Sequence, residues 1–216
     1  MKKTIPLLVA AIAFASSSLA QAQQTGPFPG FYAGLSIGQS KGTNVSEGEV
    51  NDFLRQQGYT NVFTSADKKD TTYRVTGGYQ FNPNVAVELL YTDIGTFGTR
   101  STVTGGTVNA DYKAKGFGVD LVLSAPMTEQ FSVFGRVGAI QAKTEASFSS
   151  SGTVGLGFAQ GSKNKTGQHY GLGLQYALSR EIAVRAEVER FRKLGDDSTG
   201  GELQADAYTV GVIFRF

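Results

Sequence analysis

Most of the chain alternates, residue by residue, between large apolar side chains and small or polar ones. The alternation recurs in eight segments: 31–38, 73–81, 85–91, 117–121, 133–137, 170–176, 184–189 and 208–216. A period of two is typical of β-strands with one apolar face. We expect most of these strands to reach ten or more residues, whereas strands of globular proteins average about five or six. That length suits a strand that crosses a membrane.

The connections between these segments also alternate in length. Three are short (82–84, 125–129 and 179–180), and four are long (41–69, 95–109, 144–164 and 193–204). Outer-membrane barrels combine short periplasmic turns with long extracellular loops. We therefore predict an all-β fold, an eight-stranded antiparallel transmembrane β-barrel in the outer membrane of a Gram-negative bacterium. An even number of strands places both termini in the periplasm. Within the first loop, residues 46–58 are expected to form a short helix.

The first 22 residues have the three parts of a secretory signal peptide. Lys2 and Lys3 precede an apolar run over residues 5–15, and Ala20-Gln21-Ala22 follows as a small-x-small cleavage site. We expect cleavage after Ala22, with Ala20 as the alternative. Residues 23–29 would then form a short periplasmic segment and residues 30–216 the barrel.

The amino-acid composition excludes several classes of protein. The chain has 216 residues and no cysteine, which excludes a disulfide scaffold and a thiol nucleophile. Its 20 basic and 18 acidic residues do not favour a nucleic-acid partner. Loss of Lys2 and Lys3 with the signal peptide would leave 18 of each sign.

One face of the predicted strands is free of charge, as contact with lipid requires. This outward face carries Phe31, Ala33, Leu35, Ile37, Val75, Tyr79, Val87, Leu89, Val119, Leu121, Val133, Val137, Leu172, Leu174, Val184, Ala186, Val188, Val210 and Val212. Aromatic residues lie near both ends of the strands, as in the two interfacial belts of membrane proteins. They are Phe31, Phe81, Phe131, Tyr176 and Phe216 at the periplasmic end, and Tyr73, Tyr91, Tyr170 and Tyr208 at the outer end.

The opposite face carries the charges. The inward-facing polar residues are Arg74, Glu88, Asp120, Arg136, Gln175, Arg185, Glu187, Glu189 and Arg215. An eight-stranded barrel has room inside for side chains and little more. Equal numbers of opposite charges therefore predict a salt-bridged, plugged lumen, with a narrow conducting pore as the alternative. Inward glycines are expected to make room for the long side chains.

Several stretches together resemble the OmpA-type eight-stranded transmembrane barrel family over residues 30–216. They are Gly77-Gly78-Tyr79-Gln80-Phe81-Asn82-Pro83-Asn84, Phe134-Gly135-Arg136-Val137-Gly138, Ile182-Ala183-Val184-Arg185-Ala186-Glu187 and Gly211-Val212-Ile213-Phe214-Arg215-Phe216. The resemblance implies lumen-facing roles for Glu88, Arg136 and Arg185. It also implies that the closing strand is a signal for the barrel assembly machinery, carried by Tyr208, Val210, Val212, Phe214 and Phe216. Full-length OmpA proteins continue into a periplasmic peptidoglycan-binding domain, whereas this sequence ends at Phe216, so cell-wall tethering is not expected.

His169 is the single histidine. Lipid A-modifying barrel enzymes use a histidine with a serine, and in the deacylase type the pair resembles His-x-Ser. Here the sequence is His169-Tyr170-Gly171, so the serine is missing. We expect a solvated histidine at a strand end and no enzymatic activity, no cofactor and no metal site.

Six basic residues fall on the outward face near the outer ends of the strands: Lys41, Lys69, Lys113, Lys115, Lys143 and Arg190. Lipopolysaccharide carries phosphates at this level of the membrane. These residues could form a basic collar for lipid phosphates through charge-assisted hydrogen bonds, or they could simply be solvated.

The predicted function is therefore that of a structural outer-membrane barrel, which contributes to envelope integrity and surface contacts. Its expected partners are outer-membrane lipid, lipopolysaccharide and the barrel assembly machinery. The alternative is an adhesin or host-factor binder that acts through the extracellular loops. Those loops offer few aromatic anchors for a partner: Phe53, Tyr59, Phe63, Phe97, Phe148 and Phe158.

Overall fold

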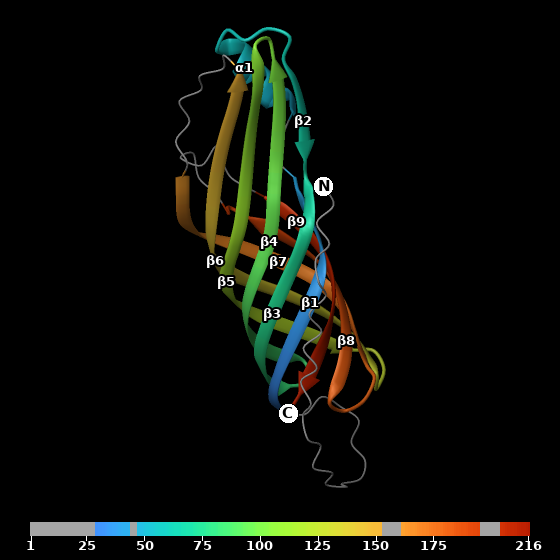
Figure 1. Cartoon of the computed structure of the whole chain (residues 1–216). Coiled ribbons are helices and arrows are strands. Elements are labelled where there is room, and N and C mark those ends of the chain that lie inside the picture. Colours follow the sequence, from blue (N-terminus) through green and yellow to red (C-terminus); the bar gives the residue numbers. More distant parts are fainter. Residues whose placement is uncertain (1–28, 44–46, 153–160, 195–203) are drawn as a thin grey trace, which may run out of the picture.

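The computed structural model describes residues 29–43, 47–152, 161–194 and 204–216. Its elements, in chain order, are β1 (Gly30–Gly42), α1 (Glu47–Gln56), β2 (Phe63–Asp67), β3 (Lys69–Asn82), β4 (Val85–Val103), β5 (Gly106–Pro126), β6 (Phe131–Gly152), β7 (Gly161–Ala177), β8 (Ile182–Arg192) and β9 (Ala205–Arg215). Figure 1 shows them as a tilted cylinder of strands with a taller extension on one side. The predicted signal peptide and most of the segment 23–29 lie outside the described residues and stay predictions.

Eight strands close into a ring. The pairing runs β4-β3-β1-β9-β8-β7-β6-β5, and an additional β4–β5 pairing joins its two ends. Every pair is antiparallel. Closure of the ring leaves no sheet edge at membrane depth, which is the condition for spanning lipid with strands. The predicted eight-stranded antiparallel barrel is confirmed, with β2 as a ninth strand outside the ring.

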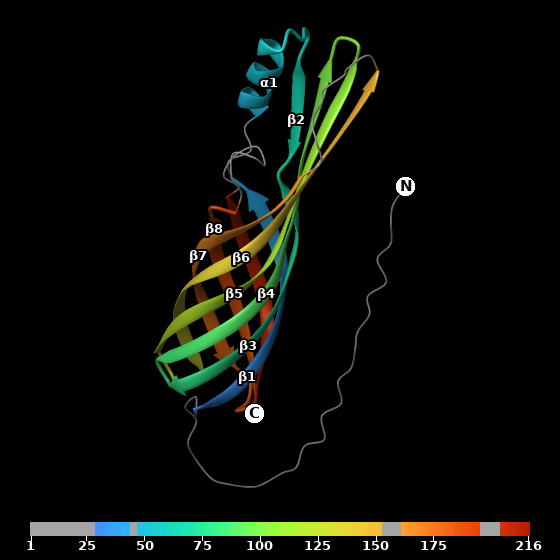
Figure 2. The ribbon, with the colours of Figure 1, turned by 90° about the vertical axis from the view of Figure 1, so that its left-hand side faces the viewer.

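The three short turns lie together at one end, here called the turn end. They join β3 to β4, β5 to β6 and β7 to β8. The other end is the outer end. There, strands β4, β5 and β6 continue well above the rest of the ring (Figures 1 and 2). The predicted long loop 95–109 is wrong, because β4 and β5 pair as far as Val103 and Gly106.

The sequence pattern also predicts loop for the rest of this taller sheet. Strand β6 extends to Gly152, and its partner β7 starts at Gly161. The error has a physical reason: these outer parts alternate Thr, Ser and Asn with small residues, and the apolar face that marks a membrane strand is absent. We call the extension above the ring the outer sheet; it comprises residues 97–103, 106–112 and 146–152 with β2.

The predicted short helix is confirmed as α1, although Ser46 of its capping pattern lies outside the described residues. Leu54 of α1 packs against Val103 and Val108 of the outer sheet. The helix is followed by β2, which pairs with β4 from Phe63↔Thr102 to Asp67↔Gly98. This strand was not predicted. No helix among the described residues is long and apolar enough to span a membrane.

A β-bulge in β4 changes which residues face inward. Pairing with β5 shifts between Asp93 and Gly95, and Gly95 has a positive φ of 110°. Leu90 and Ile94 are buried before the bulge, and Phe97 and Val103 are buried after it. Even-numbered residues therefore face the lumen below Gly95, and odd-numbered residues face inward above it.

Below the bulge, the two faces match the sequence pattern. Every residue of the predicted outward face is exposed or half-buried on the protein's outer surface. Aromatic residues gather toward both ends of that surface. At the turn end the rings of Phe31 and Tyr79 lie 4.9 Å apart, and toward the outer end those of Tyr91 and Phe117 lie 4.8 Å apart.

Candidate functional site

The lumen contains one connected cluster of buried charges, and Glu88 of β4 lies at its centre. Its Oε1 accepts hydrogen bonds from Arg185 Nη1 at 2.7 Å and from the Tyr32 hydroxyl at 2.7 Å, and its Oε2 accepts one from Arg136 Nη2 at 2.9 Å. Glu88 has no solvent exposure. Charge-assisted hydrogen bonds to two arginines compensate the burial of this carboxylate.

Two further contacts extend the cluster across the barrel. Arg136 Nη1 donates to Asp120 Oδ2 at 3.1 Å, and its Nη2 lies 3.1 Å from Glu187 Oε2. Arg74 of β3 reaches Glu187 and Glu189 of β8. The strands β3 and β8 are not neighbours in the ring, so these ion pairs link opposite parts of the wall.

His169 belongs to the same cluster, which corrects the prediction of a solvated strand-end histidine. Its side chain is fully buried. Nδ1 contacts Glu189, and Nε2 lies 2.8 Å from Asp120 Oδ1. The ring stacks on Phe191 with centroids 5.2 Å apart. Because both ring nitrogens face carboxylate oxygens, the surroundings favour the doubly protonated, cationic form of His169.

The sequence had one available signal for this placement: His169 has the parity of the inward-facing residues of β7. It lies among three potential metal-ligating groups with Asp120 and Glu189. Arginine contacts to both carboxylates, Arg74 to Glu189 and Arg136 to Asp120, make that group a structural ion cluster rather than a favourable cation site.

Two predicted lumen residues lie nearer the turn end. Gln175 Oε1 accepts from Arg185 Nη2 at 3.0 Å, so Gln175 joins the cluster through Arg185. Arg215 is half-buried and contacts no carboxylate within ion-pair distance in the described part of the chain. The predicted balance of four basic and four acidic groups therefore holds with His169 in the place of Arg215.

Apolar side chains pack inside the barrel on both sides of the charges, which the inward-facing sequence pattern does not predict. The layer toward the outer end contains Leu90, Ile94, Phe97, Ala114, Ile140, Ala142, Phe191, Leu194, Ala205 and Ala207. The layer toward the turn end contains Tyr32, Ala86, Val122, Phe134, Ala183 and Ile213. The pair Leu89-Leu90 was an available signal, because consecutive large apolar residues on a strand place one of them inside.

Inward glycines provide space, as predicted, and they do so for aromatic rings as well as for charges. A Cβ on Gly138 would lie 2.0 Å from Asp120 Oδ1 and 2.9 Å from His169 Nε2. A Cβ on Gly78 would meet the Tyr32 ring, and one on Gly173 would meet the Phe134 ring. The two rings of the turn-end apolar layer therefore depend on glycine in a neighbouring strand.

The six residues of the predicted collar lie on the outer surface, in two groups. Lys41 and Lys69 are directly opposite one another on β1 and β3, and Lys115 and Lys143 are opposite on β5 and β6. Like charges at directly opposite positions destabilise a sheet.

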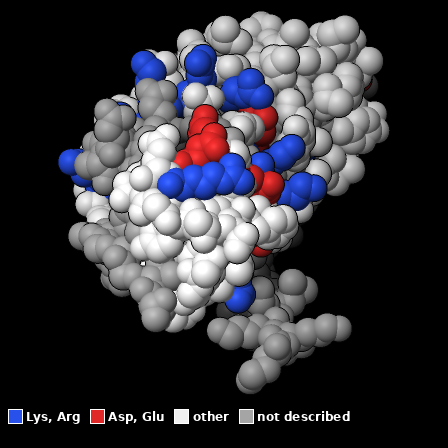
Figure 3. All heavy atoms as spheres, turned by 90° about the horizontal axis from the view of Figure 1, so that it is seen from above, with Lys and Arg blue, Asp and Glu red and all other residues white. Residues whose placement is uncertain are grey.

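Three acidic residues lie beside the basic residues of the collar and pair with them. Arg190 makes a bidentate pair with Asp206, Lys143 Nζ lies 2.7 Å from Glu145, and Lys113 Nζ lies 3.8 Å from Asp93. Figure 3 shows basic and acidic side chains side by side around the outer end.

The closing strand β9 pairs with β1 and β8 and completes the ring. Its alternate residues Tyr208, Val210 and Phe214 are exposed on the outer surface, Val212 is half-buried there, and Phe216 follows the strand with its side chain exposed. The last strand therefore presents a continuous apolar row.

Comparison with known proteins matches residues 7–216 to the family described as outer membrane protein beta-barrel domain. The chain belongs to this family. It is an outer-membrane β-barrel protein, which confirms the family resemblance and the predicted location in the envelope of Gram-negative bacteria.

Individual relatives agree with this assignment. Over 218 residues the chain is 28% identical to outer membrane protein A of Salmonella typhi, which covers all of this chain and 56% of that protein. It is 29% identical over 208 residues to outer membrane protein P5 of Haemophilus influenzae, covering 90% of this chain and 53% of that protein. The chain spans about half the length of the curated relatives it matches.

Among solved structures, Neisserial surface protein A has the same fold with a TM-score of 0.55. The two are 12% identical, over 86% of this chain and 97% of that one.

Proposed function

We propose that this outer-membrane barrel is a non-enzymatic structural protein with a plugged lumen, which contributes to envelope integrity. The observation that carries the proposal is the stack of three filled layers inside the barrel: apolar, charged, apolar. Water and ions would have to pass two apolar layers and a buried ion cluster, and hydrophobic constrictions oppose conduction by dewetting. His169, the residue that a lipid-modifying enzyme would need, is fully enclosed among Asp120, Glu189 and Phe191.

Planar-bilayer recording tests the plug against the narrow-pore alternative. The folded protein should insert without producing stable current steps of defined size. The control is heat-modifiable gel mobility of the same preparation, which shows that the inserted protein is folded. Stable channels from a heat-modifiable preparation would contradict the plugged lumen.

Two further parts of the proposal concern assembly and orientation. Both termini would face the periplasm, with the turn end, and the apolar row of β9 would be the segment that the barrel assembly machinery recognises. The support is the position of β9 as the strand that closes the ring on β1, together with the length difference between the two ends of the barrel.

We also propose that the collar binds phosphates of lipopolysaccharide. Its support is the two opposed lysine pairs, Lys41 with Lys69 and Lys115 with Lys143, because a bound anion between two lysines would turn their repulsion into attraction. The acidic neighbours neutralise part of the positive charge of the collar. An anion would therefore bind most favourably at the two lysine pairs.

The lysine pairs predict an effect whose sign depends on the surroundings. Replacement of Lys69 and Lys115 by Gln should lower the thermal stability of the protein in lipopolysaccharide-containing membranes. In uncharged detergent the same change should leave stability unchanged or raise it, because it removes two like-charge contacts. Thermal unfolding in both media measures the difference, and equal losses in the two media would contradict phosphate binding.

A second candidate function is surface binding, which the outer sheet favours. This sheet rises beyond the ring and exposes Phe63 on β2, with Phe53 on α1 also exposed. Two other predicted anchors are not available to a partner, since Phe97 is buried and Tyr59 packs against the α1 cluster, while Phe158 lies outside the described residues. Binding of whole cells to host surfaces, with and without the double change Phe53→Ser and Phe63→Ser, tests this candidate. Unchanged adhesion would argue against these two anchors.

A further inference from the structure

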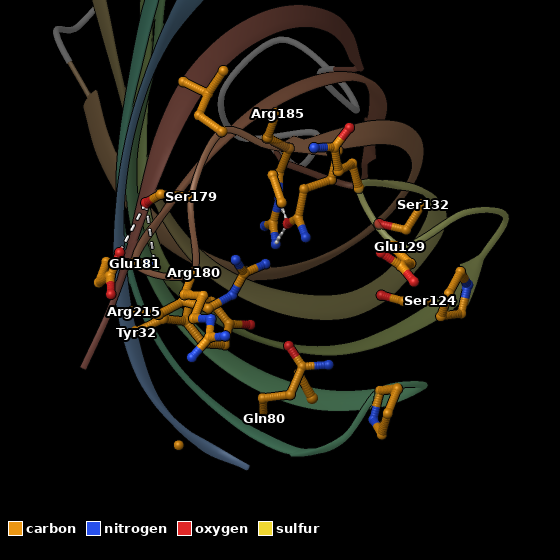
Figure 4. A pocket seen from close by; sticks show the side chains of 18 of the residues that line it. Tyr32, Gln80, Ser124, Glu129, Ser132, Ser179, Arg180, Glu181, Arg185 and Arg215 are labelled. Atoms are coloured by element: carbon orange, nitrogen blue, oxygen red, sulfur yellow. Dashed lines mark hydrogen bonds between the residues drawn. The ribbon is translucent and has the colours of Figure 1, made fainter. Parts of the chain in front are cut away.

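A pocket of about 370 Å³ opens at the turn end of the lumen. It lies beyond the apolar layer that contains Tyr32 and Val122, both of which contribute to its floor. Figure 4 looks into it and shows Arg215 and Tyr32 on one side, Ser124 and Ser132 on the other, with Gln80 and Arg185 between them. This volume falls within the range of small-molecule sites.

Arg215 differs from the other lumen arginines in having no carboxylate partner. Arg74, Arg136 and Arg185 each contact at least one glutamate. Within the described ranges, no acidic side chain lies within 4.0 Å of the Arg215 guanidinium. Its side chain is nevertheless half-buried in the pocket wall.

The charge balance of the lumen leaves Arg215 uncompensated. The buried cluster contains four carboxylates and three arginines, and Arg215 is not one of these arginines. The carboxylates are those of Glu88, Asp120, Glu187 and Glu189. His169 supplies the fourth positive charge, because both of its nitrogens face carboxylates. The cluster is therefore neutral without Arg215, whose charge is open to an anion that enters the pocket.

Several other polar groups of the wall can donate hydrogen bonds. Gln175 is held by Arg185 through its Oε1, so its amide nitrogen keeps N–H groups for a ligand. Ser124 and Ser132 add hydroxyl groups. A wall that contains the side chains of Arg180, Arg185 and Arg215 beside these amide and hydroxyl donors favours a ligand rich in acceptors.

Two carboxylates, Glu129 and Glu181, lie in the wall of the pocket, on the turns at the barrel end. Glu181 is engaged within its own turn, where Ser179 Oγ donates to its Oε2 at 2.9 Å. This hydrogen bond lowers the pKa of Glu181. The Glu181 carboxylate is held by the turn, and neither it nor Glu129 forms an ion pair with Arg215 in the described part of the chain.

We propose that this pocket, the turn-end vestibule, binds a small oxyanion such as a carboxylate or a phosphate through Arg215. The planar guanidinium would take two anion oxygens in bidentate fashion, and the amide nitrogen of Gln175 would donate a further hydrogen bond to the anion. In the proposed orientation the ligand enters from the periplasm. The inference concerns the vestibule alone and does not depend on whether the lumen conducts.

Calorimetric titration with inorganic phosphate and, separately, acetate tests the proposal on the full chain folded in a phosphate-free, uncharged detergent. At least one of the two anions should bind saturably, with one site per chain. Arg215→Gln should weaken that binding at least tenfold, which corresponds to about 1.4 kcal/mol. Arg215→Lys should bind the anion with an affinity between those of the unchanged protein and Arg215→Gln, since lysine keeps the charge and loses the bidentate geometry.

The matched control is Arg192→Gln, which removes an exposed arginine at the outer end of β8. It should bind the anion as the unchanged protein does. Heat-modifiable mobility shows that each variant is folded, and if Arg215→Gln does not fold, the comparison rests on Arg215→Lys. Unchanged affinity in the Arg215 variants, equal loss in Arg192→Gln, or no saturable binding of either anion would each overturn the proposal.

Discussion

At the scale of single residues, Glu88 is the position on which the lumen depends most. It accepts hydrogen bonds from two arginines and a tyrosine while fully buried. Removal of one partner from a buried ion pair leaves an uncompensated charge, which costs about 3–5 kcal/mol. The ion pair itself need not add net stability relative to apolar residues. The destabilisation comes from the buried charge that is left without a partner.

Glu88→Gln should therefore lower the free energy of unfolding by about 3–5 kcal/mol. Glutamine keeps the size of the side chain, so loss of packing does not confuse the result. The matched change Glu129→Gln, on an exposed turn residue, should stay within about 0.5 kcal/mol. Urea unfolding in lipid vesicles measures both, and similar small effects for the two variants would argue against a stabilising role of the cluster.

At the scale of the element, the bulge at Gly95 determines which residues of β4 face inward. Asp93 and Asp70 hold it: Gly95 N donates to Asp93 Oδ1 at 3.1 Å, and Thr96 N donates to Asp70 Oδ2 at 2.7 Å. The inversion of the inward parity lets Phe97 pack in the apolar layer toward the outer end and turns Val103 toward α1. A strand without the bulge would direct these side chains outward.

Gly95→Ala should destabilise the protein by about 1–3 kcal/mol, since its φ of 110° is strained for any residue with a Cβ. The added Cβ would also lie 2.8 Å from Asp70 Cβ. Gly77→Ala on β3 is the control, because a Cβ there meets nothing within 4 Å; it should be neutral or slightly stabilising. Urea unfolding in lipid vesicles measures the stability of both variants. An equal effect at both positions would show that the bulge is not strained.

At the scale of the whole molecule, the barrel and the outer sheet form two structural parts. The ring is held by eight strand pairings and by the side chains that pack inside it, whereas the outer sheet is stabilised by β4–β5–β6 pairing and by the small cluster under α1. Local stability is expected to be lower in the part with fewer buried apolar contacts.

Removal of residues 97–112 and a direct reconnection of Thr96 to Lys113 through a two-residue Asn-Gly turn should leave the barrel folded. Thr96 and Lys113 are already paired, so the shortened hairpin keeps its register. Gel mobility should still shift between unheated and boiled samples, while protease should cleave near α1, which loses Val103 and Val108. Absence of the mobility shift would show that the barrel needs the outer sheet to fold.

The sequence by itself determined the strand class, the number of ring strands, the short turns, the lipid-facing residues and most of the lumen charges. It could do so because the period of a strand and the cost of a charge in lipid act locally, residue by residue. Only the tertiary structure decided which charges meet. Arg74 reaches Glu187 and Glu189 across 113 and 115 residues, and Arg185 reaches Glu88 across 97. Such contacts depend on ring closure, strand register and one bulge, and none of these changes the alternation that the sequence displays. For the same reason the surroundings of His169 and Tyr32 and the two apolar layers were found only in the structure, as was the lack of an ion-pair partner for the Arg215 guanidinium among the described residues.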